Sequence, residues 1–353
     1  MVTTNLRGGG AERVLIRLAS MLGARGHEVH IVLLEYLVDH SIDDGLSLHA
    51  LTQFGRPCRK GFIGKHIAAW RLRSLVAKLS AGRPFDLVIS TLPFADEVAR
   101  IARLPRLWHR IANTLSAEVA RLQGNRRSRR LARYRRLYRD ARLIAVSDGV
   151  AEDLRREIGL ANATIRRIYN PYDFDAIRRL AAEPAPQRPD GRYVLHVGRF
   201  AEQKRHDLLF DAWRRLGLPE RLVLLTPPNE GLDRLIAEHG LSDRVLVAGF
   251  QANPYPWMRG AQLLVLCSDH EGMPNVLVEA LACGTPVVST DCPSGPREIL
   301  GSDSRWLVPC REPAQLAAAI RDALQSASMA PVDLSRFDAP RVLGEIEALA
   351  AIP

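Results

Sequence analysis

The sequence predicts two doubly wound Rossmann-like α/β domains, each built on a parallel sheet. Short apolar strand signals alternate with helical stretches through both halves of the chain, which is typical of parallel sheets covered by helices on both faces. The alternation stops once, at 181–191, where three prolines and a glycine indicate a linker. A chain of 353 residues is also long enough for two domains. We therefore expect one domain over 1–180 and a second over 181–335.

The strand signals are apolar or β-branched runs bounded by turn residues. In the first domain they lie at 28–34, 86–91, 142–147 and 164–169. In the second they lie near 192–198, 221–226, 244–249, 262–267 and 286–290. Helices are expected from Ala11 to Leu22 and from Val150 to Ile158, the latter capped by Ser147-Asp148. Only about five residues precede the first glycine loop, so either the native start lies upstream or the edge of the sheet is trimmed.

Composition argues against several classes of protein. No window holds the ~18 uninterrupted apolar residues that a membrane span requires. The N-terminus lacks a charged leader followed by an apolar stretch, so no signal peptide is expected. The five cysteines form no Cys-x-x-Cys pair, which favours reduced thiols in a cytoplasmic protein and no structural metal.

Charge is divided unevenly along the chain. Residues 1–185 hold 32 Lys and Arg against 18 Asp and Glu, a net charge of +14, whereas 186–353 carry −4. Nine arginines and one acidic residue lie between Arg126 and Arg142, with Leu131, Tyr134 and Tyr138 at helical spacing. We expect this segment to dock on an anionic membrane surface while its apolar stripe packs on its own domain. Nucleic acid is not an expected partner, because no reader module accompanies the arginines.

Two segments that follow strands suit an anionic ligand. The loop at 7–13 contains Gly8, Gly9 and Gly10 before a helix, where backbone amides can approach an anion. Arg13 stands where a dinucleotide fingerprint has its last glycine, which counts against such a fingerprint. Arg199 and Lys204 follow a strand that ends at Val197, and a planar fork with a point charge suits a diphosphate.

The segment at 268–289 is the most specific. Its strand ends in a turn that carries Glu271, and the turn from Gly272 to Asn275 opens a helix whose first amides have no intrahelical acceptor. Glu279 lies about one turn into this helix. Two carboxylates near a helix N-terminus suit a ribose or another polyol joined to phosphate.

These residues resemble the signature of the retaining glycosyltransferases of family four, whose GT-B fold places two Rossmann-like domains across a cleft. Glu271 and Glu279 reproduce the family's two glutamates separated by seven residues, and Arg199 and Lys204 match its phosphate-binding pair. The glycine loop resembles the family loop that faces the donor diphosphate. The segment at 170–173 resembles the one before its interdomain linker.

The resemblance implies transfer of a hexose or N-acetylhexosamine from a nucleoside-diphosphate sugar to a glycan or lipid-linked acceptor in surface polysaccharide synthesis. Glu279 would bind the ribose, Glu271 would lie near the transferred sugar, and a helix over 336–353 would cross back to the first domain. Donor contacts would come from Gly9, Gly10, Arg199, Lys204, Phe250, Gly272, Met273, Asn275, Val276 and Glu279.

The catalytic group of the first domain is less clearly marked. Many family members carry a histidine at the end of a strand there, and the matching region is 107–113. Either His109 or Asn113 would face the donor. A lone histidine beside Trp108 is more often structural, which favours Asn113 as the catalytic residue beside Glu271, Arg199 and Lys204.

The resemblance implies that the acceptor attacks from the same face that the diphosphate leaves, and that the diphosphate helps to deprotonate it. Cations and backbone amides would stabilise the negative charge of the diphosphate, so no metal cofactor is expected. Asp173 and Asp175 form an Asp-x-Asp motif but follow no strand end, so we expect no metal there. UDP is the preferred nucleotide of the donor and GDP is the alternative, because the stretch at 291–298 resembles relatives that use UDP-sugars. Two other functions stay open, a GT-B sugar-nucleotide epimerase and a catalytically silent binding subunit.

Overall fold

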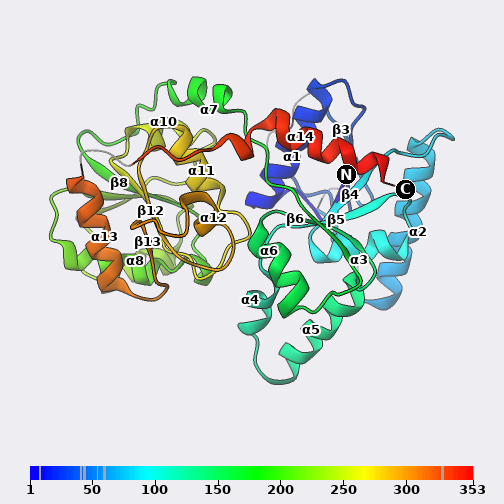
Figure 1. Cartoon of the computed structure of the whole chain (residues 1–353), viewed down its shortest axis with the longest axis horizontal. Coiled ribbons are helices and arrows are strands. Elements are labelled where there is room, and N and C mark those ends of the chain that lie inside the picture. Colours follow the sequence, from blue (N-terminus) through cyan, green and yellow to red (C-terminus); the bar gives the residue numbers. More distant parts are fainter. Residues whose placement is uncertain are drawn as a thin grey trace. The chain divides into compact units, whose positions relative to one another are not determined.

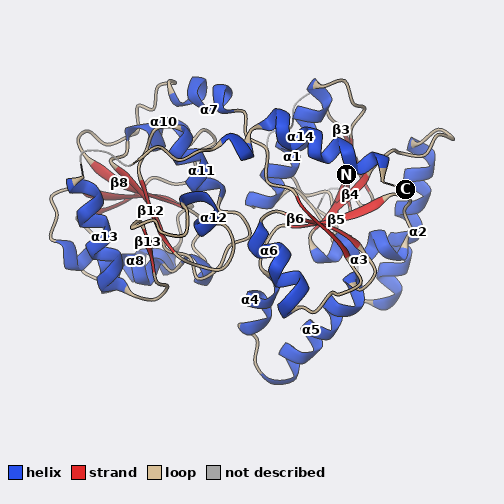
Figure 2. Cartoon of the chain, viewed as in Figure 1, coloured by secondary structure: helices blue, strands red, loops and turns tan. Residues whose placement is uncertain are grey.

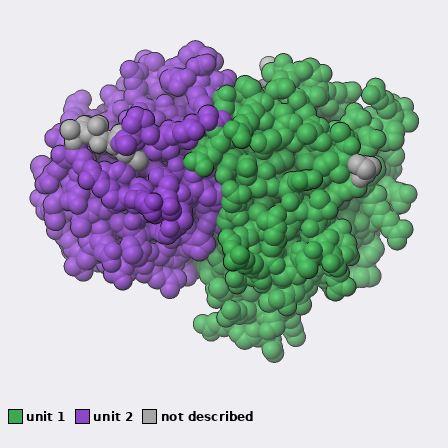
Figure 3. Space-filling model, in the orientation of Figure 1, with its two compact units in different colours: residues 1–171, 336–353 green, residues 172–335 purple. Residues whose placement is uncertain are grey.

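The computed structural model describes residues 1–7, 9–39, 42, 45–53, 55–58, 61–326 and 330–352. The chain divides into two compact units, unit 1 with residues 1–171 and 336–353 and unit 2 with residues 172–335 (Figure 3). The last segment therefore belongs with the N-terminal residues. The first boundary lies before α7 (Phe174–Ala181), not after residue 180, because α7 packs on α10 (Tyr255–Gly260). The proline-rich stretch is a loop inside unit 2.

Unit 1 contains a seven-stranded parallel sheet in the order β3-β2-β1-β4-β5-β6-β7 (Figure 1). β1 is central, because it pairs with both β2 and β4, so the expectation of a trimmed sheet edge is wrong. The strand order reverses between β1 and β4. The strands are β1 (Val2–Thr3), β2 (His30–Leu33), β3 (Ser47–Ala50), β4 (Val88–Thr91), β5 (Leu107–Ile111), β6 (Arg142–Ala145) and β7 (Thr164–Arg167).

Helices cover both faces of this sheet. On β2, Ile31 and Leu33 pack with α1 on one face, whereas Val32 packs with α2 and α3 on the other, as the alternation of side chains along a strand requires. Ser147 caps α6 as predicted, accepting a hydrogen bond from the amide of Val150 at 3.1 Å. The helices are α1 (Gly10–Ala24), α2 (Phe62–Leu79), α3 (Pro93–Ile101), α4 (Leu115–Ala120), α5 (Gly124–Tyr138), α6 (Asp148–Glu152), which continues as a π-helical turn (Asp153–Glu157), and α14 (Ala339–Ala348).

Helix α14 is the element that carries the chain end back to unit 1. Its Glu347 carboxylate binds Arg25 Nε at 2.8 Å and His27 Nε2 at 2.8 Å, both at the end of α1. Phe337, just before α14, is fully buried and lies edge-on to Tyr169 with 4.8 Å between ring centroids. These contacts explain why the last residues cluster with the first.

Unit 2 contains a six-stranded parallel sheet in the order β10-β9-β8-β11-β12-β13, again between layers of helices (Figure 2). The order reverses between β8 and β11. The strands are β8 (Tyr193–Val197), β9 (Arg221–Leu225), β10 (Val245–Val247), β11 (Leu263–Leu266), β12 (Val287–Thr290) and β13 (Leu307–Val308). The remaining helices are α8 (His206–Leu216), α9 (Glu230–Glu238), α11 (Asn275–Ala282), α12 (Pro296–Leu300) and α13 (Pro313–Gln325), with a 3-10 turn (Glu202–Lys204) before α8.

Each predicted strand coincides with an observed strand, and the predicted helices are α1 and α6 with its π-helical continuation. Both sheets are parallel and doubly wound, so the predicted fold class is confirmed. Within the described residues, no helix combines the length and apolarity needed to cross a bilayer.

Two histidines are buried side by side in the core of unit 2. His196 on β8 and His206 at the start of α8 have ring centroids 4.8 Å apart. Burial lowers the pKa of His196 to about 4 and the pKa of His206 to about 3. Both rings are therefore neutral in the folded chain at neutral pH.

We predict that acid destabilises unit 2 through these rings. Their folded pKa values lie below the ordinary value of about 6.5, so the unfolded chain binds more protons and stability falls as the pH drops from about 7 towards 4. Each ring should remove about 2 kcal/mol of unfolding free energy between pH 7 and 5. Urea unfolding at both pH values measures this, and His206→Phe should halve the loss while His66→Phe, on the surface of unit 1, should not alter it.

Candidate functional site

The candidate site of unit 2 lies at the carboxyl ends of β8 and β11, where the strand order reverses. Ligands of doubly wound sheets bind at such a switch point, because the loops on its two sides diverge. The loop after β8 carries Arg199 and Lys204, and the loop after β11 carries Glu271. The fold thus brings together two of the three predicted segments.

Lys204 and Glu271 form a half-buried ion pair. Lys204 Nζ lies 2.6 Å from Glu271 Oε1, and the side chains are 21% and 10% exposed. Ser268 Oγ donates a second hydrogen bond to the same carboxylate oxygen at 2.7 Å. The carboxylate therefore holds the ammonium group at the strand ends, where an anionic ligand could take its place.

Arg199 is the exposed cation of this site. Among the described residues it forms no hydrogen bond or ion pair, whereas Lys204, in the same loop, is paired. A guanidinium group that is not engaged by the protein can bind phosphate oxygens with two parallel hydrogen bonds. The two cations therefore differ in role, with one held in place and one available to a ligand.

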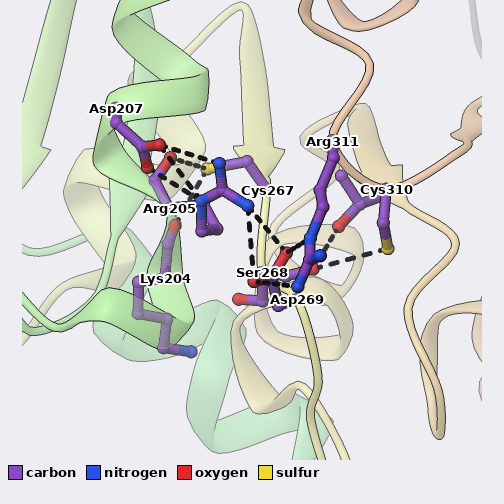
Figure 4. Close-up of polar contacts among 9 residues, drawn as sticks. Lys204, Arg205, Asp207, Cys267, Ser268, Asp269, Cys310 and Arg311 are labelled. Atoms are coloured by element: carbon purple, nitrogen blue, oxygen red, sulfur yellow. Dashed lines mark hydrogen bonds and ion pairs between the residues drawn. The ribbon is translucent and has the colours of Figure 1, made fainter. Parts of the chain in front are cut away.

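A charged clamp fixes the backbone around Lys204 (Figure 4). Arg205 Nη2 lies 2.8 Å from Asp207 Oδ2, and Arg205 Nη1 lies 3.1 Å from Asp269 Oδ1. Arg311 approaches the same Asp269 carboxylate to 3.2 Å from the other side. The hydrogen bond with Asp207, followed by the two nearby carboxylate charges, raises the pKa of Arg205 above its ordinary value. This network ties the loop after β8 to the loop after β11.

Hydrogen bonds involving the backbone strengthen the same junction. The Asp269 amide donates to the Gln203 carbonyl at 2.9 Å, and Gln203 Nε2 donates to the His270 carbonyl at 2.6 Å. The Cys267 thiol donates to the Lys204 carbonyl at 3.1 Å. Burial raises the pKa of Cys267 to about 12, so the thiol stays protonated and serves as a donor rather than a nucleophile.

Helix α11 carries the remaining predicted residues of the third segment. It begins at Asn275, whose Oδ1 accepts a hydrogen bond from the Tyr172 hydroxyl at 2.5 Å. Glu279 is 3% exposed, one turn further along. The first amides of a helix lack intrahelical acceptors, and this first turn includes Val276. A buried carboxylate one turn behind these amides fits a polyol joined to phosphate.

The turn before α11 is shaped by close packing on the loop after β12. Gly272, Met273 and Pro274 are buried. Gly295 has a φ of +99°, and a Cβ atom there would lie 2.2 Å from Pro274 Cδ and 3.3 Å from Met273 Cα. Only glycine satisfies both the backbone conformation and this approach. Gly295 thus lets the loop after β12 pack directly against this turn.

The loop after β10 presents one aromatic side chain to solvent. Phe250 is 57% exposed. Gln251 Nε2 donates to the Ala248 carbonyl at 2.8 Å, and Asn253 Nδ2 binds the Glu183 carboxylate at 2.7 Å. Because both amides are engaged within unit 2, the exposed ring is the group of this loop that could stack on a base.

The glycine loop of unit 1 follows β1, at the point where that sheet reverses its order. Gly9 precedes α1 and Gly10 is its first residue, whereas Gly8 lies outside the described residues. A Cβ on Gly9 would lie 1.9 Å from Glu12 Oε2. The Glu12 carboxylate therefore already occupies the positive end of α1, and any ligand anion would compete with it.

His109 is part of a buried network in unit 1. Its Nδ1 lies 2.7 Å from Ser90 Oγ, which donates to Asp96 Oδ1 at 2.5 Å, and the Tyr138 hydroxyl donates to Asp96 Oδ2 at 2.7 Å. All four residues are at most 2% exposed. His109 is thus enclosed within unit 1 and hydrogen-bonded there. Asn113, two residues after β5, is half-buried.

The Asp-x-Asp motif is engaged locally at α7. Asp173 caps the helix through the Ala176 amide at 2.8 Å, and Asp175 pairs with Arg178 at 2.7 Å. No group of three or more metal-ligating side chains occurs in the part of the chain that the structure describes. All five cysteines are free thiols.

Four residues that position this site were not predicted from the sequence, namely Arg205, Asp269, Arg311 and Gly295. Arg205 follows Lys204 directly and Asp269 lies inside the third segment, so both stood beside predicted residues. Their partners are 64 and 42 positions away along the chain, and no local pattern indicates such pairs.

We predict that Gly295→Ala distorts the turn before α11. The left-handed backbone and the contact with Pro274 should together lower the free energy of unfolding by about 2–4 kcal/mol. Gly301→Ala is the matched control, since Gly301 has a φ of +87° but open space around it, and it should lose about 1–2 kcal/mol. Urea unfolding of both variants measures the difference, and equal losses would contradict the proposed contact.

Comparison with known proteins gives the same assignment for both units. The family model described as "Glycosyl transferases group 1" matches residues 191–326, and the one described as "Glycosyltransferase Family 4" matches residues 8–176. The N-acetylgalactosamine-N,N'-diacetylbacillosaminyl-diphospho-undecaprenol 4-alpha-N-acetylgalactosaminyltransferase of Campylobacter jejuni is 30% identical over 310 residues, which cover 86% of this chain and 83% of that protein. The lipopolysaccharide 1,6-galactosyltransferase of Salmonella typhimurium is 32% identical over 165 residues, 44% of this chain and 45% of that protein.

Solved structures share the fold over almost the whole chain. Sucrose-phosphate synthase from Thermosynechococcus elongatus superimposes with a TM-score of 0.74 at 18% identity, covering 99% of this chain and 96% of that one. HepE from Anabaena, in complex with UDP and glucose, gives 0.73 at 20% identity, covering 99% of both chains. The fold is therefore the GT-B fold, and the chain belongs to the group 1, family 4 glycosyltransferases.

Proposed function

We propose that this glycosyltransferase moves a hexose or N-acetylhexosamine from UDP to a lipid-linked or polysaccharide acceptor, with retention of configuration. The observation that carries the proposal is the arrangement at the β8–β11 switch point. There Arg199 is unengaged among the described residues and Lys204 is held by Glu271 at 2.6 Å. Cations at this position suit the diphosphate of a sugar nucleotide.

The geometry supports distinct roles for these residues. As the glycosidic bond breaks, negative charge develops on the leaving diphosphate, and preorganised donors stabilise that charge. Lys204 would exchange Glu271 for a phosphate oxygen, and Arg199 would bind a second phosphate. Glu271, released from the ammonium group, would accept hydrogen bonds from the sugar, and Glu279 would accept them from the ribose.

Retention of configuration is supported by the family to which the chain belongs, and two nucleophilic groups at the strand ends are already engaged as hydrogen-bond donors. The Cys267 thiol is protonated and donates to a carbonyl, and the Ser268 hydroxyl donates to Glu271. In a retaining transfer without a protein nucleophile, the acceptor hydroxyl would attack from the face that the diphosphate leaves, and a diphosphate oxygen would take its proton. Asn113, two residues after β5, is our candidate for a further catalytic group, and Gly9 and Gly10 are our candidates for amide donors to the diphosphate.

The preference for UDP is supported by the relatives and by Phe250. HepE was solved with UDP, with UDP and glucose and with UDP-glucose, and the Campylobacter relative is named for N-acetylgalactosamine transfer. An exposed ring such as Phe250 can stack on any base, so GDP is the alternative. An epimerase and a silent binding subunit are not proposed further, because the relatives are named as transferases.

An acceptor held at a membrane is supported by the names of the relatives and by α5. The Campylobacter relative is named for an undecaprenol-linked acceptor, and the Salmonella relative for lipopolysaccharide. In α5, Tyr134 and Tyr138 are fully buried, as expected for the apolar stripe. Arginines exposed on this helix and available to anionic lipid are Arg126, Arg127, Arg129 and Arg136.

The proposal is tested by ligand-dependent stabilisation followed by a transfer assay. UDP at about 100 times its dissociation constant should add about 2.7 kcal/mol to the unfolding free energy, and GDP should add less. Sugar transfer from UDP-hexoses and UDP-N-acetylhexosamines to an undecaprenyl-diphosphate glycan, with analysis of the product anomer, then tests activity and retention. Stabilisation by GDP but not UDP would overturn the donor assignment, and an inverted product would overturn retention.

We predict that Lys204→Ala lowers kcat/KM, because the cation that would stabilise the developing charge on the diphosphate is lost. The loss should correspond to about 2–4 kcal/mol of transition-state stabilisation. Glu279→Gln should raise KM for the donor through the weakened ribose contact. Steady-state kinetics with the preferred donor measures both effects. Arg234→Ala, an exposed cation of α9, is the matched control and should leave kcat/KM unchanged. Unchanged kinetics in both site variants would contradict the site assignment.

Activity should survive excess EDTA. Arg199, Lys204 and the first turn of α11 would supply the positive charge that a divalent ion provides in other transferases, while Asp173 and Asp175 serve α7. Initial rates with and without EDTA measure this. Complete loss of activity, restored by manganese, would show that a metal is required.

A further inference from the structure

Asn113, the candidate catalytic group of unit 1, is held by hydrogen bonds on both sides of its side-chain amide. Its Oδ1 accepts a hydrogen bond from the Thr114 amide at 3.0 Å, and its Nδ2 donates to Glu118 Oε1 at 3.0 Å. A backbone amide can only donate and a carboxylate can only accept, so these two partners fix which side of the group carries the nitrogen. The second hydrogen on Nδ2 has no acceptor among the described residues, so it can be donated to a ligand.

Glu118 is itself fixed by helix α5. Its second oxygen, Oε2, accepts a hydrogen bond from the Tyr134 hydroxyl at 2.9 Å, and Tyr134 is fully buried on α5. Helices α4 and α5 pack on each other (Figure 1). Burial, followed by the nearby Glu118 charge, raises the pKa of Tyr134 to about 12, so the hydroxyl stays protonated and acts as the donor. Each oxygen of Glu118 thus accepts a hydrogen bond from another side chain.

Capping of α4 does not account for these contacts. A glutamate in the first turn of a helix ordinarily compensates the unpaired amides there. The amides of Leu115 and Ser116, the first two residues of α4, instead donate to Asp153 Oδ2 at 2.9 and 3.3 Å. Asp153 begins the π-helical turn after α6 and is 5% exposed. Because a different carboxylate serves the start of the helix, Glu118 is left to bind the Asn113 side chain.

We propose that Glu118, held in turn by Tyr134, positions Asn113 for the transfer reaction. Asn113 presents its remaining Nδ2 hydrogen to an oxygen of the sugar nucleotide, and Glu118 acts only through this amide. A donor that is already in place contributes more to the reaction than one that must be ordered during it. The inference rests on the proposed function, in which Asn113 is a candidate catalytic group. It adds two positioning residues, neither of which contacts the reacting atoms.

A double-mutant cycle tests whether Glu118 acts through Asn113, with kcat measured at saturating donor and acceptor. Glu118→Ala should lower kcat about tenfold or more, because the amide is no longer held in its reactive orientation. In the Asn113→Ala background the same substitution should change kcat less than about twofold, because the group that it positions is absent. Equal losses in the two backgrounds would overturn the proposal, and so would an Asn113→Ala variant with wild-type kcat.

A conservative variant separates positioning from a chemical role of the carboxylate itself. Glu118→Gln keeps an oxygen that accepts from Asn113, and the Tyr134 hydroxyl can rotate to accept from the new N–H group. It should therefore keep kcat within about threefold of the wild-type value and leave the pH profile of kcat unchanged. A carboxylate that acted as a base would be lost in Glu118→Gln as completely as in Glu118→Ala. Equal loss of kcat in these two variants would overturn the positioning role.

Two tyrosines of α5 provide a matched control for stability. Tyr134→Phe removes the hydroxyl that holds Glu118 and should lower kcat about threefold to tenfold. Tyr138→Phe removes the hydroxyl of an equally buried tyrosine on the same helix, which donates to Asp96 at 2.7 Å. Both variants should lose a similar amount of unfolding free energy in urea, but Tyr138→Phe should keep wild-type kcat. An equal fall of kcat in both variants would show that activity follows stability alone and would overturn the proposal.

Donor binding separates this proposal from the proposed function. The three residues of this network lie in unit 1, whereas Lys204 and Glu279 lie in unit 2. UDP should therefore stabilise each variant as it stabilises the wild type, and KM for the donor should change less than kcat. An active wild-type chain whose Glu118→Ala variant keeps full kcat overturns the positioning role alone. A wild-type chain that is stabilised by no nucleotide and transfers no sugar contradicts the proposed function and, with it, the positioning role that rests on it.

Discussion

The candidate site of unit 2 depends on one constraint, that the loops after β8 and β11 remain joined. Lys204 and Glu271 come from different loops, and their ion pair is largely removed from water. Such a pair is stable only when both groups are held in good geometry, because each charge loses hydration. The ion pairs that Asp269 forms with Arg205 and Arg311 supply that geometry, because they join the two loops beside the pair. Under the proposed function, a donor phosphate would replace the carboxylate with little rearrangement, which is the preorganisation that transition-state stabilisation requires.

The features that sequence predicted well are those set by neighbours along the chain. Strand β11, its turn and helix α11 follow from an apolar run, a glycine and proline turn and a helical stretch within a few residues. Glu271 and Glu279 could be placed on this strand, turn and helix because residues close in sequence determine its conformation. The carboxyl ends of β8 and β11 then had to lie together, since parallel strands end at one edge of the sheet.

The features that sequence did not predict depend on distant packing. Helix α7 belongs to unit 2 because of its contacts with α10, and its own sequence gives no sign of this. β1 is only two residues long but central, because pairing on both sides compensates for its length. His109 was one of two candidates to face the donor, yet it lies in the middle of β5, where its Nδ1 is 2.7 Å from Ser90 Oγ and 3.4 Å from Asp96 Oδ1. In each case the partner lies elsewhere in the chain.

Part of the positive charge of the N-terminal half is used in contacts within the fold. Two arginines of α5 serve the fold, since Arg133 binds Glu97 and Arg135 donates to the Ile158 carbonyl at 2.8 Å. The arginine-rich stretch is therefore partly structural. By contrast, residues 45–85, which include α2, contain fewer cations and no acidic residue, although Glu97 of α3 pairs with Lys65, and they add exposed apolar area. Electrostatic attraction to anionic lipid falls off within a Debye length, whereas apolar insertion adds binding energy that salt does not screen. A surface that combines both is better suited to stable docking than arginines alone.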